Sequence, residues 1–136
     1  MSEANVDTVR GIYDAVARRD AVTPFEVYAK GIVWDHSNTR RAGLMTKAVY
    51  QGHEGVRQFW RESLSVFGEI DLEVEELIDA GDHVLAVIRE HEVGRASGVP
   101  VETTHLAVWT LAGGKVIQMQ VFDDRHQALE AAGLRG

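Results

Sequence analysis

The fold is decided by residues 51–75, QGHEGVRQFWRESLSVFGEIDLEVE, because the hydrophobic period changes inside this one stretch. In its first part large side chains recur at steps of three and four residues, which is typical of an amphipathic helix with one buried face. The residues on this face are Val56, Phe59, Trp60, Ser63, Leu64 and Phe67. From Glu69 to Glu75 apolar and acidic residues alternate, and this period of two predicts a strand with one solvated face. We therefore expect a helix from about Glu54 to Phe67 that stops at Gly68 and is followed directly by a strand.

Two further helices are predicted before this stretch. Apolar residues at steps of three and four predict the first helix, and Ser2 is placed to cap its start. The residues of its apolar stripe are Val6, Val9, Tyr13 and Val16. Thr23 followed by Pro24 is typical of an N-cap and a helix start, because proline costs nothing at the first helical position. A short second helix should therefore extend to about Ala29.

Strands and turns account for most of the remaining chain. The predicted strands are 32–36, 69–75, 84–88, 101–111 and 116–122, with a loop at 37–47, turns at 79–82 and 112–115 and a terminal helix at 128–132. Residues 84–88 and 116–122 are apolar on both alternations, which predicts cover on both faces of the sheet. Since one helix layer covers only one face, we expect a homodimer built on the outer face. The pattern as a whole predicts an α+β fold, in which helices on one side of a curled antiparallel sheet leave an internal pocket for a small-molecule ligand.

Composition excludes several classes of function. The chain has 21 acidic and 14 basic residues and a net charge of −7, so nucleic acid and membrane surfaces are poor partners for it. It contains no cysteine, which removes disulfides and thiolate nucleophiles. The longest apolar run, residues 84–88, is too short to cross a bilayer, and the N-terminus lacks the pattern of an export signal. We therefore expect a cytoplasmic protein.

No cofactor is predicted. The six histidines form neither a helical i, i+4 pair nor an H-x-H pair on one strand, so we expect no metal site. The chain also lacks a Gly-rich phosphate loop, a G-x-S-x-G elbow and a dinucleotide fingerprint. We expect a single domain over residues 1–136 whose chemistry uses side chains alone.

Several segments resemble the SnoaL-like, nuclear transport factor 2-like superfamily. The matching segments are Tyr50–Val56 with Phe59 and Trp60 at the start of its third helix, Val108–Leu111 with Gly114–Val116 in its fourth-strand hairpin, and Asp124–Arg125 with Ala128–Leu134 in its C-terminal tail. The resemblance implies a cone-shaped domain of cystatin-like topology, with the sheet wrapped around helices and an internal pocket. It does not select a reaction, since this fold hosts isomerases, cyclases, hydrolases, dehydratases and non-catalytic binders.

Ketosteroid isomerases of this superfamily imply roles for three residues. Tyr13 is similar in position to the tyrosine that those enzymes use in an oxyanion hole. His36 falls at the position of their proton-transferring aspartate, and His105 falls close to their oxyanion-hole aspartic acid. Because histidine replaces both acids, the chain departs from the steroid isomerase pattern.

Two other kinds of relative imply further candidates. The Arg-x-Asp of limonene epoxide hydrolases resembles Arg89–His91, where His91 replaces one aspartate, and their last-strand motif resembles Phe122–Arg125. SnoaL-type polyketide cyclases use an aspartate near the end of the last strand together with a histidine from a neighbouring strand. Asp123 and His105 are similar to that pair.

Asp123 and His36 are also candidates on chemical grounds. Asp123 ends an apolar strand, and a carboxylate that faces an apolar cavity is disfavoured in its charged form and can exchange protons near neutral pH. The alternative is that Asp123 caps the terminal helix, although Asp124 lies nearer to that helix. His36 shares a strand face with Trp34, and a neutral histidine in a pocket both donates and accepts hydrogen bonds. The alternative for His36 is an exposed residue at a strand end.

Arg89 and His91 share one face of the strand that we expect to be central. A buried arginine requires a carboxylate partner, for which Asp123 is available, or an anionic group of a ligand. The alternative is an ion pair on the outer face with one of the acidic residues nearby, Glu73, Glu75 or Glu92. The choice between the two positions depends on which set of alternating residues of this strand points to the inside.

The expected function is cofactor-free acid/base chemistry of the isomerase or cyclase type on a small, mostly apolar carbonyl or cyclic compound. In this hypothesis Asp123 is the acid/base, His36 or His105 assists it, and Tyr13 or Arg89 stabilises oxyanion charge. The residues expected to bind substrate are Trp34, Phe59, Trp60, Arg89 and His91. The alternatives are a non-catalytic ligand-binding or dimerisation module and an epoxide hydrolase-like hydrolase. Tyr13 lies on the apolar stripe of its helix, and the alternative for it is a plain core position with its hydroxyl satisfied.

Overall fold

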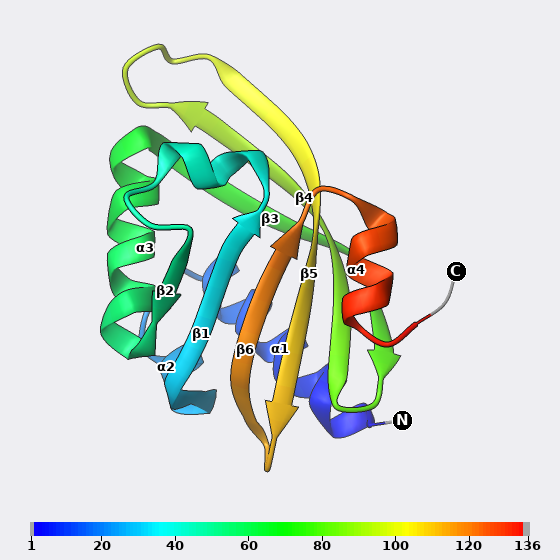
Figure 1. Cartoon of the computed structure of the whole chain (residues 1–136). Helices are drawn as coiled ribbons and strands as arrows, with labels where there is room; N and C mark the ends of the chain where they lie inside the picture. Colours follow the sequence, from blue (N-terminus) through cyan, green and yellow to red (C-terminus); the bar gives the residue numbers. More distant parts are fainter. Residues whose placement is uncertain (1, 135–136) are drawn as a thin grey trace.

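The computed structural model describes residues 2–134, except for the side chain of Arg41. Helices and strands follow one another in the order shown in Figure 1. They are α1 (Glu3–Ala17), α2 (Thr23–Val27), β1 (Tyr28–Asn38), η1 (Arg40–Leu44), β2 (Val49–Gln51), α3 (Gly52–Val66), β3 (Phe67–Ala80), β4 (His83–Gly94), β5 (Pro100–Ala112), β6 (Lys115–Phe122) and α4 (Arg125–Ala131). The expected α+β class is confirmed, and β2 and η1 are short elements that the sequence pattern did not predict.

One six-stranded sheet has the strand order β2-β1-β6-β5-β4-β3. All neighbouring strands are antiparallel except β1 and β6, which pair in parallel. The sequence predicted antiparallel pairing only. A parallel pair needs a long crossover connection, and the whole segment between β1 and β6 supplies it, which no local pattern reveals.

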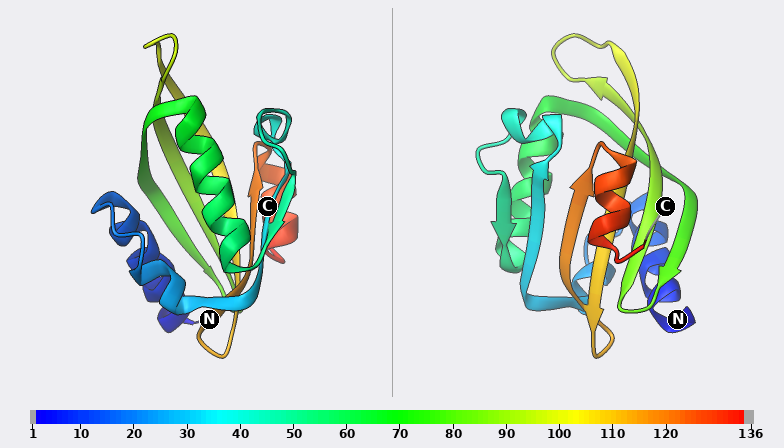
Figure 2. Two further views of the ribbon diagram at one scale, coloured as in Figure 1. Left: turned by 90° about the vertical axis from the view of Figure 1, so that its left-hand side faces the viewer. Right: turned by 45° about the vertical axis from the view of Figure 1, so that its right-hand side comes forward.

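The sheet curves around α3. Figure 2 shows α3 lying in the concavity of the sheet. Helices α1 and α2 lie on the same side of the sheet as α3. Register shifts between Val74 and Glu76 in β3 and between Tyr28 and Val33 in β1 mark irregular pairing of the kind that bends strands. The predicted long helix in the concave face is therefore confirmed. Its last expected residue, Phe67, instead begins β3 with extended backbone angles of −115° and 127°.

Helix α4 packs on the outer face of the sheet (Figures 1 and 2). Together with apolar outward-facing side chains it forms a second core cluster, whose buried members are Leu85, Leu106, Val108, Phe122, Ala128 and Ala132. The two-sided apolar pattern of the central strands therefore has a cover within the same chain. The reason for which we expected a homodimer on this face does not apply where α4 lies.

Local sequence signals for helix ends were correct at two positions and wrong at one. The side chain of Ser2 caps α1 by accepting from the backbone N–H of Asn5, and Asp124 caps α4 by accepting from that of His126. Thr23, expected as the N-cap of α2, is instead its first residue. The preceding carboxylate of Asp20 accepts from the backbone N–H of Thr23 and from its hydroxyl, so an acidic residue outside the helix orders this corner.

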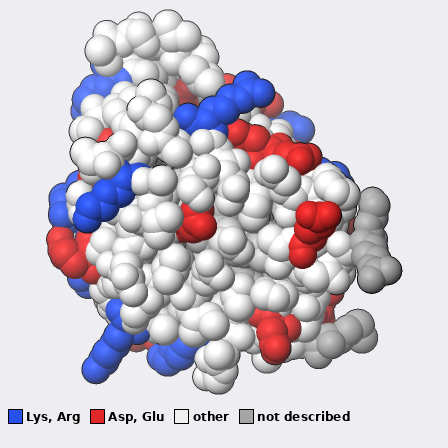
Figure 3. All heavy atoms as spheres, viewed as in Figure 1, with Lys and Arg blue, Asp and Glu red and all other residues white. Residues whose placement is uncertain are grey.

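The described helices are short, and the basic side chains on the outer face are dispersed. Among residues 2–134, no helix combines the length and the apolar character needed to cross a bilayer. Figure 3 views the outer face, on which Lys and Arg side chains lie in separate small groups rather than in one continuous basic patch.

Candidate functional site

A cavity of about 350 Å³ lies between the concave face of the sheet and helices α1 and α3. Its walls come from α1, from α3, from the loop before η1 and from all strands except β2. Pockets for small ligands generally occupy about 300–1,000 Å³, so the cavity has the size for a small organic molecule. The elements that surround the cavity are far apart in the sequence. They meet only because the sheet curves.

Aromatic side chains form much of the cavity wall. Trp34 and His36 extend from the same face of β1, and both contact Phe59 of α3, whose ring centroid lies 4.3 Å from that of His36. Trp60 lies beside Phe59 and also lines the cavity. The expected convergence of Trp34, His36, Phe59 and Trp60 on one pocket is therefore present, and His36 is buried rather than exposed at a strand end.

Glu90 and His105 form a largely buried carboxylate–imidazole pair in the same wall. His105 of β5 pairs in register with Ile88 of β4, so Glu90 stands diagonally across from it on the same face. His105 Nδ1 lies 3.3 Å from a carboxylate oxygen of Glu90, and the two side chains are only 16% and 8% exposed. A carboxylate at Nδ1 favours the tautomer with its proton on that nitrogen, which leaves Nε2 to accept a proton from a ligand.

The indole of Trp109 holds the Tyr13 side chain in the cavity. Trp109 Nε1 donates a hydrogen bond of 3.0 Å to the Tyr13 hydroxyl oxygen, and both side chains are buried. Burial raises the pKa of Tyr13 well above its usual value, and the Glu90 carboxylate nearby adds to the rise, although the bond from Trp109 opposes it. Tyr13 therefore remains a neutral hydroxyl. Because its oxygen already accepts from Trp109, its hydrogen is available for donation.

Trp34 contributes a buried donor with no acceptor among the residues that the structure describes. Its indole nitrogen is shielded from solvent, although the Trp34 side chain lines the cavity. A buried donor that lacks an acceptor costs about 1–3 kcal/mol, so such groups are rare and call for an explanation. A rotation of this ring toward an acceptor on a bound ligand would remove that cost.

Asp123 lies at the mouth of the cavity and not in its apolar interior. It follows the last residue of β6 and is exposed, and its Oδ2 accepts a 2.9 Å hydrogen bond from the backbone N–H of Arg40. Thr39 and Arg40 line the mouth with it, so the predicted loop at 37–47 does border the pocket. The alternative role of helix cap is excluded for Asp123, because Asp124 caps α4.

The expectation that Arg89 and His91 contribute to the cavity is corrected. Both side chains lie on the outer face of β4, which is the alternative position that the sequence left open. Arg89 Nε lies 3.1 Å from Glu75 and 3.6 Å from Glu102, whereas His91 lies 3.5 Å from Glu73 and 3.3 Å from Glu102. These exposed pairs contribute little to stability and do not reach a ligand in the cavity.

Glu90 is the functional candidate that sequence reasoning missed. Alternation from Val84 through Ile88 would place Glu90 in the cavity, but alternation from Leu85 through Val87 would place Arg89 there equally well. Both series are apolar because α4 covers the outer face. The sequence pattern therefore does not show which series of side chains faces the cavity. A pairing of His105 with the strand before it could have pointed to Glu90, since the two lie on facing strands of one hairpin.

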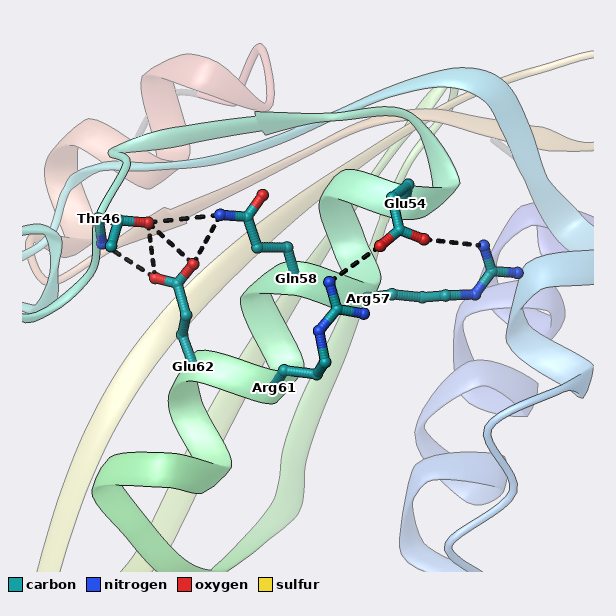
Figure 4. Close-up of polar contacts among 6 residues, drawn as sticks. All are labelled: Thr46, Glu54, Arg57, Gln58, Arg61 and Glu62. Carbon is teal, nitrogen blue, oxygen red and sulfur yellow. Dashed lines mark hydrogen bonds and ion pairs between the residues drawn. The ribbon is translucent and has the colours of Figure 1, made fainter.

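A hydrogen-bond network holds the loop at residues 37–47, which borders the mouth of the cavity, against α3. The Glu62 carboxylate of α3 accepts from the backbone N–H and hydroxyl of Thr46, from the Tyr50 hydroxyl and from the Gln58 amide. Figure 4 shows Thr46 and Gln58 meeting Glu62 from the loop and from the helix. These donors, with the backbone N–H of Thr46 first, lower the pKa of Glu62 from its ordinary 4.5 to about 2.

We expect the substitution Glu62→Gln to loosen this loop in a pH-dependent way. The pKa of Glu62 is lower in the folded than in the unfolded chain, so its stabilising effect is complete above pH 4.5 and is lost as the pH falls toward about 2. The difference in urea midpoint between wild type and Glu62→Gln should therefore be constant from neutral pH to about 5 and shrink below 4.5. A difference that does not vary with pH would show that the network leaves the pKa of Glu62 unchanged.

The described side chains offer no cluster for a metal ion. Within the part of the chain that the structure describes, no three acidic or histidine side chains lie close enough together to coordinate one. The titratable groups that line the cavity are two carboxylates, Glu90 inside and Asp123 at the mouth, with two histidines, two tyrosine hydroxyls and the Arg40 guanidinium.

A curved sheet wrapped around a long helix, with a cavity between them, defines a cone-shaped class of α+β domain. The family model described as the SnoaL-like domain matches residues 9–119, which is most of the chain. The chain belongs to this SnoaL-like family. Among curated proteins, none matches the sequence.

Solved structures share the fold over nearly the whole chain. A nuclear transport factor 2-like protein from Burkholderia thailandensis is 25% identical, with 99% of this chain and 100% of that one covered and a TM-score of 0.78. TerC, co-crystallised with polyporic acid, is 20% identical over 96% of this chain and 99% of its own, with a TM-score of 0.80. A protein with a ketosteroid isomerase-like fold from Catenulispora acidiphila, in complex with trimethylamine, is 13% identical over 94% and 93%, with a TM-score of 0.71. The cone-shaped fold expected from the resemblance is confirmed.

Proposed function

We propose that this protein is a cofactor-free acid/base enzyme that acts on a small, mostly apolar carbonyl compound. The observation that carries the proposal is the buried Glu90–His105 pair in the wall of an aromatic cavity. A buried carboxylate–histidine pair is expensive to desolvate, and such a pair in the wall of a cavity is a candidate for a catalytic site. The ligands named for TerC and for the protein from Catenulispora acidiphila are in keeping with a small-molecule site in this fold.

The geometry supports proton transfer next to a carbonyl group. His105 Nε2 removes a proton from the carbon adjacent to the carbonyl, and the electron pair of the broken C–H bond moves to the carbonyl oxygen as an enolate. Tyr13 donates its hydroxyl hydrogen bond to that oxygen, while Glu90 stabilises the imidazolium that forms. If the proton returns to another carbon, the overall reaction is an isomerisation. If the enolate attacks a second carbonyl of the same molecule, the reaction is a cyclisation. His36 is a second proton carrier within the same cavity.

Exchange of hydrogen for deuterium tests the proposal without knowledge of the substrate. Incubation of the protein in D₂O with an enolisable bicyclic ketone such as β-tetralone should speed loss of the α-proton signal in the NMR spectrum. An absence of catalysed exchange across a panel of cyclic ketones and diketones that do bind would support the alternative, a non-catalytic ligand-binding module. The epoxide hydrolase alternative lacks its arginine, because Arg89 lies outside the cavity.

Asp123, the acid/base group expected from the sequence, needs its own test. Asparagine keeps an acceptor oxygen for the backbone N–H of Arg40 but cannot cycle a proton. With Glu90 and His105 as the acid/base pair, we expect Asp123→Asn to change the exchange rate by less than about tenfold and to leave the melting temperature nearly unchanged. A fall of about 10²-fold or more at unchanged ligand affinity would instead make Asp123 the acid/base group.

Assembly and location remain predictions. Light scattering at micromolar concentration tests the homodimer, and a monomer would contradict it. The cytoplasmic location depends on the sequence pattern alone.

A further inference from the structure

A second cleft, of about 660 Å³, opens between the α1–α2 corner and α3. Figure 2 shows these helices diverging on the side of the molecule away from α4. Four residues line both this cleft and the inner cavity: Val16, Tyr28, Trp60 and Ile70. The cleft and the cavity are therefore neighbours separated by single side chains, of which Trp60 is only half-buried.

The floor of the cleft is apolar and its rim carries guanidinium groups. Pro24 and Phe25 form one wall, and Leu64, which is 43% exposed, forms part of the other. Arg57 of α3 lies over the Phe25 ring, with its guanidinium carbon 4.6 Å from the ring centroid. The guanidinium thus occupies this face of the Phe25 ring and is held at the edge of the apolar wall.

The arginines of the cleft are incompletely neutralised. Arg57 and Arg61 share one carboxylate, that of Glu54, at 3.8 Å and 2.9 Å, and all three side chains are largely exposed (Figure 4). In Figure 4 Arg57 extends from α3 toward the segment that joins α1 to β1. Arg19, the third arginine of the cleft, is paired with Asp71 at 2.7 Å.

Two carboxylates also line the cleft, Asp20 and Glu69. Asp20 is engaged in hydrogen bonds with the start of α2, which lower its pKa to about 2. Arg19 is offset by Asp71, and Asp20 lies 3.8 Å from Arg18. The unbalanced positive charge of the cleft is therefore that of Arg57 and Arg61, which share the single carboxylate of Glu54. In a chain whose net charge is −7, this pair of arginines is a local site that favours an anionic group of a ligand.

We propose that the cleft is a second ligand subsite, which binds a flat apolar group carrying a sulfonate, carboxylate or phosphate. The continuity with the inner cavity makes it the outer half of one elongated site. The enolisable end lies beside Glu90, and the aryl end lies against the apolar wall that includes Leu64, with its anion beside the guanidinium groups of Arg57 and Arg61. Only the assignment of the inner half rests on the proposed function.

Two fluorescent dyes that differ in one charged group test the subsite. Anilinonaphthalene sulfonate has the apolar rings and the anion, whereas N-phenylnaphthylamine has the rings alone. At low ionic strength we expect the double substitution Arg57→Gln with Arg61→Gln to raise the Kd of the sulfonate dye about tenfold, the combined effect of two exposed charge contacts. The Kd of the neutral dye should change by less than about twofold.

Matched variants locate the dye and separate the possible failures. The double substitution Arg10→Gln with Arg125→Gln removes the same charge from α1 and α4, away from the cleft, and should leave both Kd values within about twofold. Leu64→Asn should weaken both dyes, because it makes an apolar wall polar. Equal losses for both dyes in the Arg57/Arg61 variant, or no effect of Leu64→Asn, would overturn the subsite. Dye binding involves no catalytic step, so these results are independent of the ketone exchange assay.

Discussion

Substitution of Glu90 by glutamine is expected to lower the rate of ketone deuterium exchange by about 10²–10⁴-fold. Glutamine keeps the size of the side chain and an oxygen for the Nδ1–H of His105, but it removes the negative charge that stabilises the imidazolium. The melting temperature should stay the same or rise, because a neutral amide is cheaper to bury than a carboxylate. A purely structural Glu90 would give the reverse result, a loss of stability with an unchanged rate.

Glu102→Gln is the matched control. Glu102 also lies beside a histidine, His91, at 3.3 Å, but on the outer face of the sheet and 58% exposed. We expect the exchange rate of this variant to equal that of wild type within about twofold. Equal rates for Glu90→Gln and wild type would remove the Glu90–His105 pair from the reaction and transfer the acid/base role to His36 or Asp123.

Phe59→Ala is expected to produce the largest change in stability. Phe59 is 7% exposed, and its ring contacts those of Trp34, His36, Tyr50 and Trp60. Truncation of a buried phenylalanine costs about 3–5 kcal/mol, through lost burial and through the cavity that remains. Because domains of this size are stable by about 5–15 kcal/mol, the variant should lose a large share of its free energy of unfolding.

Urea unfolding measures this change, and Leu64→Ala serves as its control. Leu64 belongs to the same predicted helical stripe, but it is 43% exposed at the edge of the outer cleft, so its truncation should cost less than about 1 kcal/mol. Similar losses for the two variants would mean that Phe59 is not a central residue of the core. The slope of the unfolding curve should match wild type in both cases.

Much of the architecture was predictable because helices and strands leave different periods in the sequence. The stripe from Val56 to Leu64 predicted α3, and the alternation from Glu69 to Glu75 predicted β3. Turn chemistry was equally informative: Gly113 and Gly114 have positive φ angles of 58° and 79°, as a tight hairpin turn of this type requires. Errors occurred at boundaries such as Phe67, where an aromatic residue suits a helix and a strand equally well.

The candidate site was only partly predictable. Tyr13 and His105 became candidates through the resemblance to the superfamily, and His36 also on chemical grounds. All three line one cavity together with Trp34, Phe59 and Trp60. The carboxylate was assigned to Asp123, which is exposed at the mouth, whereas the buried carboxylate that lines the cavity is that of Glu90. Arg89 and His91 were assigned to the cavity and lie outside it.

The sequence by itself determined the order and type of the main elements, the apolar faces that they bury and most of the aromatic wall of the cavity. Only the tertiary structure decided the parallel pairing of β1 with β6, the outer cleft and the inward direction of Glu90. The physical reason is that a period of two tells which residues share a face but not which face is inside. That distinction normally comes from the polarity of the outer face, and α4 removes it by covering Leu85 and Val108 with apolar residues of its own.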